Sequence, residues 1–350
     1  MDYRTELLQA LGEGFVIERE LDGAGASQVF VARERALGRQ VVVKMLPKSL
    51  ANEVNRERFQ REIAVAARLQ HPHLVPLLTA GVIGSAGIPW FSMPFVEGES
   101  LRELLTRRGA LPVLTAARLL REIASALSYA HGRGVVHRDI KPENILLSDG
   151  VAMVTDFGVA MAVDTASDTP VGVRRRLTAV GAILGTPAYS APEQISSAGM
   201  VDHRADVYSL GCVAYEILGG SSPFAGRNLR DLLYAQVNER PAPLDHVRPG
   251  LPPAIVAVVM RCLEKDPEQR PQSASHIVAV IDGLTITSLS ETAENPAVIS
   301  DRLRATTGLR APGPAALSAE SRPGRSHPIL IAVALTLAAI VSIVAFVALR

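Results

Sequence analysis

The spacing of hydrophobic residues changes along the chain and predicts strands first and helices afterwards. Apolar and polar residues alternate from Phe15 to Leu21, and short apolar runs follow at 29–32 and 41–43, which is typical of strands. The first fourteen residues form a short lead-in, for which we expect a helix. Two further strands are predicted at 74–82 and 90–96.

Helical spacing dominates the rest of the folded region. Residues 58–69 place their apolar side chains on one face, and Glu62 lies beside that face. A longer helical pattern covers 101–132 and is strongest over 116–131. The apolar face of that strongest part consists of Leu119, Leu120, Ile123, Ala126, Leu127 and Ala130. Helical patterns continue to about Gly283, so the predicted fold class is α+β.

The end of the sequence has a different character. Residues 285–327 show no apolar periodicity and are rich in Ser, Thr, Ala, Pro, Gly and Arg, which predicts a disordered linker. The next 21 residues, 329–349, carry no charge. As a helix they would be about 32 Å long, enough to cross a hydrocarbon core of about 30 Å. We therefore predict a transmembrane helix at 328–349.

Two observations support this membrane assignment and its orientation. A buried core helix is disfavoured because only Arg350 follows the apolar segment, so we expect no domain beyond it. Arg322 and Arg325 precede the segment, and this basic flank places the folded region in the cytoplasm. The N-terminus is polar and acidic, so no signal peptide is expected. The sequence predicts a single-pass protein of the cell membrane.

Charge and cysteine content narrow the function classes. Lys and Arg number 36 against 35 Asp and Glu, for a net charge of +1, and no basic stripe alternates with aromatic residues. We therefore expect no nucleic-acid partner. The dense basic run Arg174–Arg176 fits a solvated loop. Cys212 and Cys262 lie in apolar, helix-like contexts, which favours buried thiols in a reducing compartment over metal ligands.

Two short polar runs in the middle of the chain carry the candidate chemistry. In the run 137–144, Asp139 is followed by Lys141 two residues later and by Asn144 five residues later. A carboxylate, an ammonium group and an amide at these offsets suit a hydroxyl nucleophile, a transferring phosphoryl group and a metal ion. The second run begins at Asp156, which precedes a large apolar residue and a glycine and suits a metal ligand on a hinge.

The run HRDIKPEN from His137, followed by DFG from Asp156, resembles the catalytic core of protein kinases. The lysine of the first run is typical of the serine/threonine form. The resemblance is to bacterial eukaryotic-like serine/threonine kinases and covers about residues 15–284. It implies ATP and Mg²⁺ as cofactors and protein serine or threonine hydroxyls as substrates. It also implies a two-lobed kinase fold, with an N-lobe at 15–93, a hinge at 94–98 and a C-lobe at 99–284.

The same resemblance assigns roles to the polar residues of the two runs. Asp139 would accept or orient the proton of the substrate hydroxyl, and Lys141 would stabilise the γ-phosphoryl group. Asn144 and Asp156 would hold Mg²⁺. Positioning and charge neutralisation would supply the catalysis, since phosphoryl transfer needs little covalent help from the protein.

A hairpin before residue 30 would cover the phosphates. The residues assigned to it by resemblance are Leu21, Gly23, Ala24 and Gly25. The three positions usually held by glycine fall on Asp22, Ala24 and Ser27, so the hairpin departs from the family pattern. Ala24 adds only a methyl group, whereas Asp22 near a phosphate is unfavourable unless its side chain points away.

The rest of the nucleotide site comes from a strand, the hinge and the C-lobe. Lys44 ends an apolar strand and would contact the α and β phosphates, and we expect an ion pair with Glu62 to position it. Met93 would guard the back of the adenine pocket. The further residues implied at the adenine are Val29, Val42, Pro94, Val96 and Leu146. Ser100 fits either a ribose contact or a helix N-cap.

The segment from Asp156 to Glu193 resembles a kinase activation segment. Thr178 is the best phosphate acceptor in it, and a phosphate there could pair with Arg138, although an unmodified threonine stays an alternative. Thr186 would hydrogen-bond the catalytic residues. Thr165, Ser167 and Thr169 are weaker acceptors.

Structural roles and a competing function complete the expectations. Asp206 is expected to anchor the catalytic loop from a buried helix, and Arg270 to pair with Glu193. A homodimer could support phosphorylation between chains. The alternative function is a membrane-tethered pseudokinase that binds ATP without turnover, which the altered hairpin favours. The presence of all six catalytic and phosphate-site residues from Lys44 to Asp156 argues against it.

Overall fold

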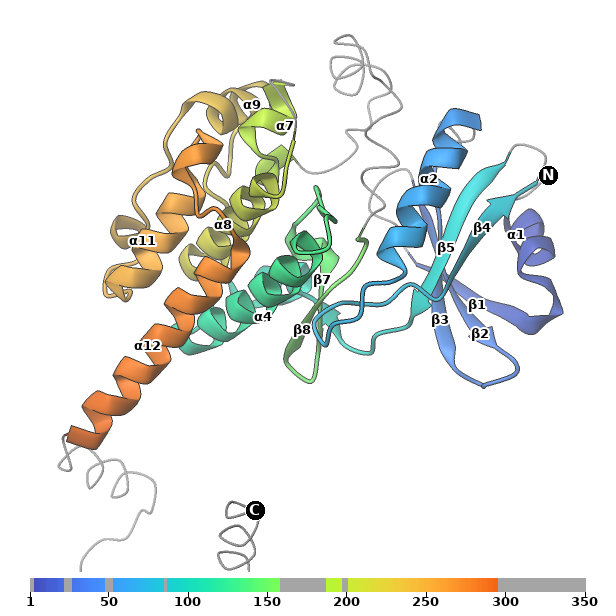
Figure 1. Cartoon of the computed structure of the whole chain (residues 1–350), viewed down its shortest axis with the longest axis horizontal. Helices are drawn as coiled ribbons and strands as arrows, with labels where there is room; N and C mark the ends of the chain where they lie inside the picture. Colours follow the sequence, from blue (N-terminus) through green and yellow to red (C-terminus); the bar gives the residue numbers. More distant parts are fainter. Residues whose placement is uncertain are drawn as a thin grey trace, which may run out of the picture. The chain divides into compact units, whose positions relative to one another are not determined.

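The computed structural model describes residues 3–21, 27–47, 53–84, 87–157, 187–196 and 201–294. Its N-terminal part holds a five-stranded antiparallel sheet with helices α1 and α2, and its C-terminal part is mainly helical (Figure 1). The two-lobed architecture expected from the sequence is therefore confirmed.

The N-lobe sheet has the strand order β1-β2-β3-β5-β4. Its strands are β1 Phe15–Leu21, β2 Gln28–Glu34, β3 Gln40–Met45, β4 Thr79–Ile83 and β5 Ile88–Pro94. The predicted strand from Leu74 is wrong in its first half. Leu74 forms an isolated parallel bridge with Val154, and the N–H of Val75 donates to the Val154 carbonyl at 2.9 Å. Pro76 has no N–H for a ladder, so the strand starts only at Thr79.

Both faces of this sheet are covered. Val41, Val43 and Met45 alternate with Val42 along β3, so they point to opposite faces. The first three pack in a cluster that includes Leu7 and Leu11 of α1 (Tyr3–Leu11), whereas Val42 packs with Phe59 and Ile63 of α2 (Glu53–Ala66).

The predicted helix in the lead-in is thus confirmed, and its buried face packs against the N-lobe sheet. Leu7 and Leu11 are only 0% and 8% exposed, because the outer face of a half-apolar sheet needs cover. The helix expected at 58–69 begins earlier and ends at Ala66, although Leu69 beyond its end is buried.

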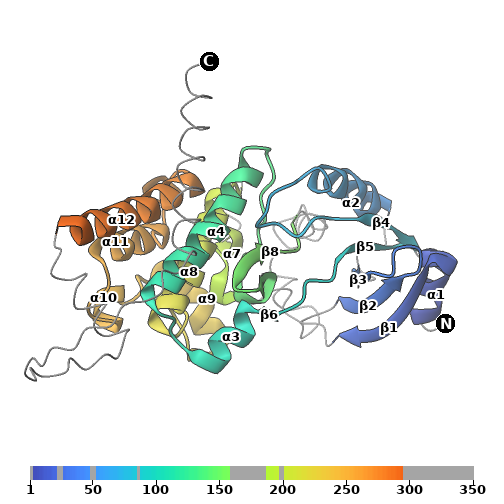
Figure 2. The same ribbon diagram turned by 90° about the horizontal axis from the view of Figure 1, so that it is seen from below.

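The C-lobe is built around α8 (Arg204–Gly219), which is buried throughout from Ala205 to Leu218. The predicted scaffold helix is α4 (Val113–His131), and its predicted apolar face is buried as expected. Figure 2 shows α4 and α8 within the C-lobe group of helices. The other helices are α3 Leu101–Arg108, α7 Pro192–Ser196, α9 Leu229–Asn238, α10 Leu244–Val247, α11 Pro253–Cys262 and α12 Ala274–Glu294.

A small sheet lies at the start of the C-lobe, in the order β6-β7-β8, with β6 Glu99–Ser100, β7 Ile145–Ser148 and β8 Val151–Val154. Its middle strand directly follows the catalytic run of the sequence. The turn Pro142–Asn144 leads directly into β7, so the strand fixes the position of the last residue of the run, Asn144.

The end of the folded region differs from the expectation. The last helix, α12, was expected to end near Gly283, but it continues to Glu294, so the linker cannot begin at residue 285. Within the described ranges no helix is long and apolar enough to cross a membrane, and the predicted span at 328–349 lies outside those ranges.

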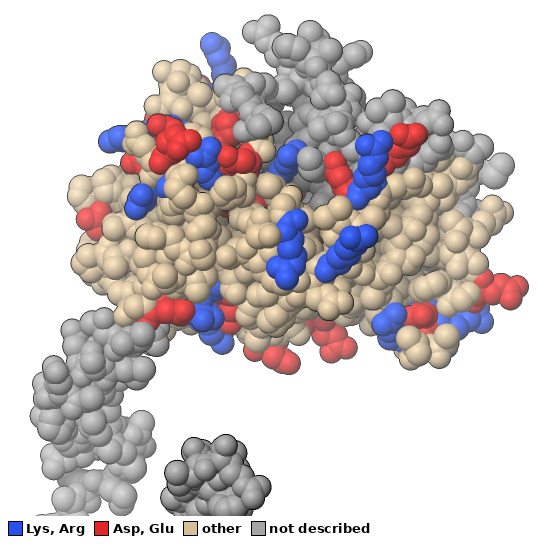
Figure 3. Space-filling model, viewed as in Figure 1, with Lys and Arg blue, Asp and Glu red and all other residues tan. Residues whose placement is uncertain are grey.

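Cysteines and surface charge agree with the sequence. Cys212 and Cys262 are buried free thiols, as predicted. Burial raises the pKa of each thiol to about 12, which keeps both protonated near neutral pH. On the face shown in Figure 3, acidic and basic side chains occur over both halves of the molecule, in keeping with a net charge of +1.

Candidate active site

A buried carboxylate on α8 holds the loop around Asp139. Asp206 is 0% exposed, and its two oxygens accept from the N–H groups of His137 at 2.7 Å and Arg138 at 2.6 Å. His131 also contacts it at 2.8 Å. Burial alone would raise the pKa of Asp206, but the hydrogen bonds from His131 and from the backbone N–H of His137 help to outweigh burial and lower that pKa. The predicted anchoring role of Asp206 is confirmed.

The loop adopts a strained backbone at this anchor. Arg138 has a φ of 66°, which residues other than glycine rarely adopt. The two N–H bonds to Asp206 compensate for this strain. They also fix the backbone one residue before Asp139. The buried helix α8 therefore helps to set the position of the Asp139 carboxylate.

Asp139, Lys141 and Asn144 converge as the sequence predicted. The ammonium of Lys141 lies 2.7 Å from Asp139 Oδ2, and the amide nitrogen of Asn144 donates to the same oxygen at 3.0 Å. That nitrogen also donates to the Asp139 carbonyl at 2.8 Å. The single turn Pro142–Asn144 brings the asparagine back toward the aspartate. The Asp139 side chain stays 37% exposed, so a substrate hydroxyl can reach it.

Lys44 reaches the second polar run. Its ammonium lies 2.7 Å from Asp156 Oδ2, which joins residues 112 positions apart. Burial alone would raise the pKa of Asp156, but the charge and hydrogen bond of Lys44 outweigh burial and lower it. Asp156 also has a positive φ of 67°, so the backbone at this residue departs from the extended conformation of the preceding strand β8.

The predicted ion pair between Lys44 and Glu62 is wrong for this structure, because among the described residues the lysine pairs with Asp156. The Asp156 side chain is only 12% exposed, so the ammonium of Lys44 offsets the cost of burying that carboxylate.

Most of the residues predicted around adenine belong to one apolar cluster or pack against it. Val42 and Met93 are paired neighbours on β3 and β5, and both are buried in it. The partly buried members packed against it include Val29, Val96 and Leu146. Leu21 is the cross-strand partner of Val29, and Pro94 is half-buried at the end of β5. Strand, hinge and C-lobe residues thus meet as the sequence predicted.

A close backbone contact sets the geometry at the end of the hinge. A Cβ atom on Gly98 would lie 1.9 Å from the carbonyl oxygen of Leu147, and Gly98 has φ of 139°.

Ser100 caps α3 in a capping box with Glu103, so the N-cap alternative for Ser100 is confirmed. Thr155 donates to the thioether of Met93 at 3.1 Å, a contact with no signal in the sequence.

The acid and amide at this site fit a divalent cation. Asp156 Oδ1 is buried and has no hydrogen-bond partner among the described residues, so it needs a cation or a donor. Asn144 spends its amide nitrogen on Asp139, which leaves its carbonyl oxygen for a metal. The described ranges hold no cluster of three or more His, Cys, Asp or Glu side chains that could bind a metal. Mg²⁺ would therefore need phosphate oxygens or water to complete its shell.

A buried polar network beside the catalytic loop was not predicted. Arg102 of α3 contacts Glu143 at 2.8 Å, Glu216 at 2.7 Å and the hydroxyl of Tyr189, which also donates to Glu216. Opposing charges hold the pKa of Arg102 well above its ordinary value despite burial. Its members come from four segments that only tertiary packing brings together, so no pattern in the sequence indicates it.

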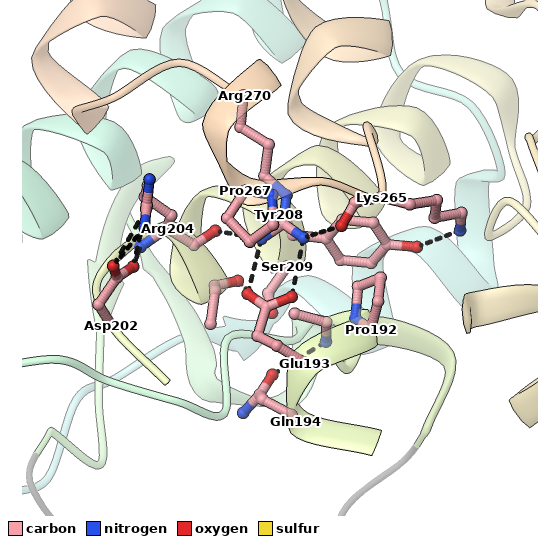
Figure 4. Close-up of polar contacts among 12 residues, drawn as sticks. Pro192, Glu193, Gln194, Asp202, Arg204, Tyr208, Ser209, Lys265, Pro267 and Arg270 are labelled. Atoms are coloured by element: carbon pink, nitrogen blue, oxygen red, sulfur yellow. Dashed lines mark hydrogen bonds and ion pairs between the residues drawn. The ribbon is translucent and has the colours of Figure 1, made fainter. Parts of the chain in front are cut away.

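The predicted pair between Glu193 and Arg270 is confirmed. Arg270 is 0% exposed and donates to both oxygens of Glu193, at 2.7 and 2.8 Å (Figure 4). This pair fixes α7 to the C-lobe. Several predicted site residues lie outside the described ranges, namely Gly23, Ala24, Gly25, Thr178 and Thr186.

Comparison with known proteins agrees with this geometry. Residues 15–280 match the protein kinase domain family. The chain is 40% identical over 276 residues to the DNA damage-responsive serine/threonine-protein kinase RqkA of Deinococcus radiodurans, covering 78% of this chain and 38% of that protein. It is 36% identical over 305 residues to the serine/threonine-protein kinase PknB of Mycobacterium tuberculosis, covering 86% of this chain and 45% of that one.

A solved structure is also similar. The Mycobacterium tuberculosis PknI kinase domain matches with a TM-score of 0.60 and 28% identity, over 77% of this chain and 96% of that domain. The chain spans less than half the length of RqkA and PknB. The chain therefore belongs to the protein kinase domain family, and it is similar to these bacterial serine/threonine-protein kinases.

Proposed function

We propose that this chain transfers the γ-phosphoryl group of ATP to serine or threonine hydroxyls of proteins. The observation that carries the proposal is the convergence of Lys141 and Asn144 on one oxygen of Asp139, at 2.7 and 3.0 Å. The ion pair between Lys44 and Asp156 adds a cation and a metal-fitting acid from a distant part of the sequence. This is the set of groups that phosphoryl transfer requires.

The residues divide the work of the reaction. Magnesium-bound ATP supplies the phosphoryl group when it is present. Asp139 orients the substrate hydroxyl and accepts its proton, and Lys141 holds that carboxylate while offering positive charge to the transferring group. Asn144 and Asp156 provide the oxygens for Mg²⁺, and Lys44 provides the charge for the phosphates. Val42 and Leu146 offer apolar contacts to the base.

We also propose that a phosphate on the activation segment regulates the activity by binding to Arg138. Arg138 Nε is buried and lacks a hydrogen-bond partner in the described part of the chain, so its guanidinium is available to an anion. Thr178 remains our proposed acceptor, and Thr186 our proposed contact to the catalytic residues. The altered hairpin from Asp22 to Ser27 remains a feature that activity measurements must assess.

The test is direct phosphate transfer. Purified protein is incubated with ATP and Mg²⁺ beside an Asp139→Asn control, and phosphorylated residues are located by mass spectrometry. We expect phosphoserine or phosphothreonine on the wild type only, with Thr178 among the modified residues. Phosphate on neither protein would favour the non-catalytic ATP-binding scaffold instead.

We also propose that residues 328–349 anchor the protein in the cell membrane with the kinase domain in the cytoplasm. Support comes from the uncharged run at 329–349 and the basic residues before it. Membrane fractions should retain the full chain after alkaline carbonate extraction and lose a variant that stops at residue 327. Release of the full chain by carbonate would contradict the proposal.

A further inference from the structure

The peptide plane that precedes Asp139 is held at both of its ends. This plane contains the carbonyl of Arg138 and the N–H of Asp139. The N–H donates to His137 Nδ1 at 3.2 Å, and the carbonyl accepts from Gln194 Nε2 at 2.8 Å. The preceding plane is held through the Arg138 N–H by Asp206. The direction in which Asp139 leaves the backbone therefore depends on Gln194.

Gln194 is itself fixed by a second bond. Its Oε1 accepts from the N–H of Ala191 at 2.9 Å, while its amide nitrogen serves Arg138. An N–H can only donate and a carbonyl can only accept, so the amide has one orientation that satisfies both. Gln194 directly follows Glu193, which Arg270 holds in the core (Figure 4). The side chain is thus a rigid link between α7 and the catalytic loop.

The backbone at Arg138 needs such a link. Its φ of 66° is unfavourable for a residue with a side chain, and such strain persists only where surrounding contacts impose it. Asp206 secures one side of Arg138 and Gln194 the other. Loss of the second contact would let the plane before Asp139 rotate while the first contact stays in place.

We propose that Gln194 is a positioning residue for Asp139, so that the end of the activation segment controls the orientation of the catalytic carboxylate. The proposal rests on the kinase activity proposed above. Gln194 touches neither nucleotide nor substrate in this account. Its effect passes through the Arg138 carbonyl, and it should therefore change turnover rather than ATP binding.

Two substitutions separate the two bonds of Gln194. In Gln194→Glu, one oxygen can still accept from Ala191, but the other faces the Arg138 carbonyl and cannot donate to it. Gln194→Met has a similar shape and loses both bonds. Ser196→Ala on the same helix is the matched control, because it removes only a hydrogen bond within α7, from the Ser196 hydroxyl to the Pro192 carbonyl, and leaves the contacts to the catalytic loop in place.

Steady-state kinetics of the full chain with ATP and casein give the first readout. We expect both Gln194 variants to lower kcat by roughly ten- to a hundredfold, with KM for ATP within about twofold, as for a misplaced catalytic group. Ser196→Ala should match the wild type. Wild-type turnover in Gln194→Glu would show that the Ala191 bond alone matters and would overturn the proposal. An equal rise in KM for ATP in both variants would also overturn it.

Hydrogen exchange completes the test. Hydrogen exchange of the peptide covering 137–140 should be faster in Gln194→Met than in the wild type or in Ser196→Ala. Unchanged exchange would refute the link even if the wild type proved unable to transfer phosphate, so the two proposals fail separately.

Discussion

Arg270 offers the sharpest stability prediction in this molecule. Its guanidinium is completely buried and donates to both oxygens of Glu193. It also donates to the carbonyls of Glu264 at 2.8 Å, Arg204 at 2.9 Å and Lys265 at 2.9 Å. Arg270→Met keeps much of the volume but removes all of these donors. It leaves a carboxylate with a side chain only 10% exposed and without its cation.

The expected loss of stability in Arg270→Met follows from the small exposed fraction of the Glu193 side chain. Breaking a buried ion pair by removing one partner costs about 3–5 kcal/mol, because the remaining charge stays desolvated. We expect the free energy of unfolding to fall by this amount in Arg270→Met. With a shift of about 2–3 °C per kcal/mol for a large domain, the Tm should fall by roughly 6–15 °C.

Urea and thermal unfolding of the full chain measure this loss. The double variant Glu193→Gln with Arg270→Met should be less destabilised than the sum of the single variants, since no buried charge remains unpaired. Arg227→Met is the control, because its pair with Glu239 at 2.7 Å is exposed and should contribute nothing measurable. If Arg270→Met is no less stable than that control, or if the two single effects simply add, the burial reasoning is refuted.

Three further predictions follow from other parts of the structure. Gly98→Ala would place a Cβ 1.9 Å from the carbonyl of Leu147 on β7, so KM for ATP should rise about tenfold or more, whereas Gly109→Ala, also at positive φ but in open space, should leave KM unchanged. Burial lowers the pKa of Lys265 from 10.5 to about 8, so its contribution to stability is fully present above 10.5 and is lost as pH falls through about 8. Urea unfolding should show the wild type gaining stability relative to Lys265→Met between pH 8 and pH 10.5, and a constant difference would contradict this. Wild-type protein mixed with the Asp139→Asn variant should phosphorylate that variant if phosphorylation occurs between chains, and phosphate confined to the wild type would exclude it.

The catalytic loop was predictable because its chemistry is local. Asp139, Lys141 and Asn144 lie within six residues, and one turn of backbone brings them together without help from distant segments. The apolar residues Val42 and Leu146 were predictable for a related reason. Each lies on a short strand whose alternation fixes which side chain faces the cluster.

Other features depend on burial, which sequence spacing does not report. The sequence offered two acids as partners for Lys44, and the contact with Asp156, which lies 112 positions away, forms only in the folded chain. The docking of α1 through Leu7 and Leu11 required knowledge that the outer face of the sheet lacked another cover. Tertiary packing determines which side chains become partners, and the spacing of residues in the sequence does not report that packing.

The two polar runs are supported from different parts of the fold. Asp139 is fixed by Asp206 of the core helix α8 and by Gln194 of α7, the helix in which the segment from Asp156 to Glu193 ends. Asp156 begins that segment and is held by Lys44 from the N-lobe sheet. The catalytic carboxylate is thus tied to the stable core and to the segment's far end, while the acid that fits a metal ion is tied to the other lobe. A change in the segment would therefore act on both acids at once, through Gln194 at one end and through the ion pair with Lys44 at the other.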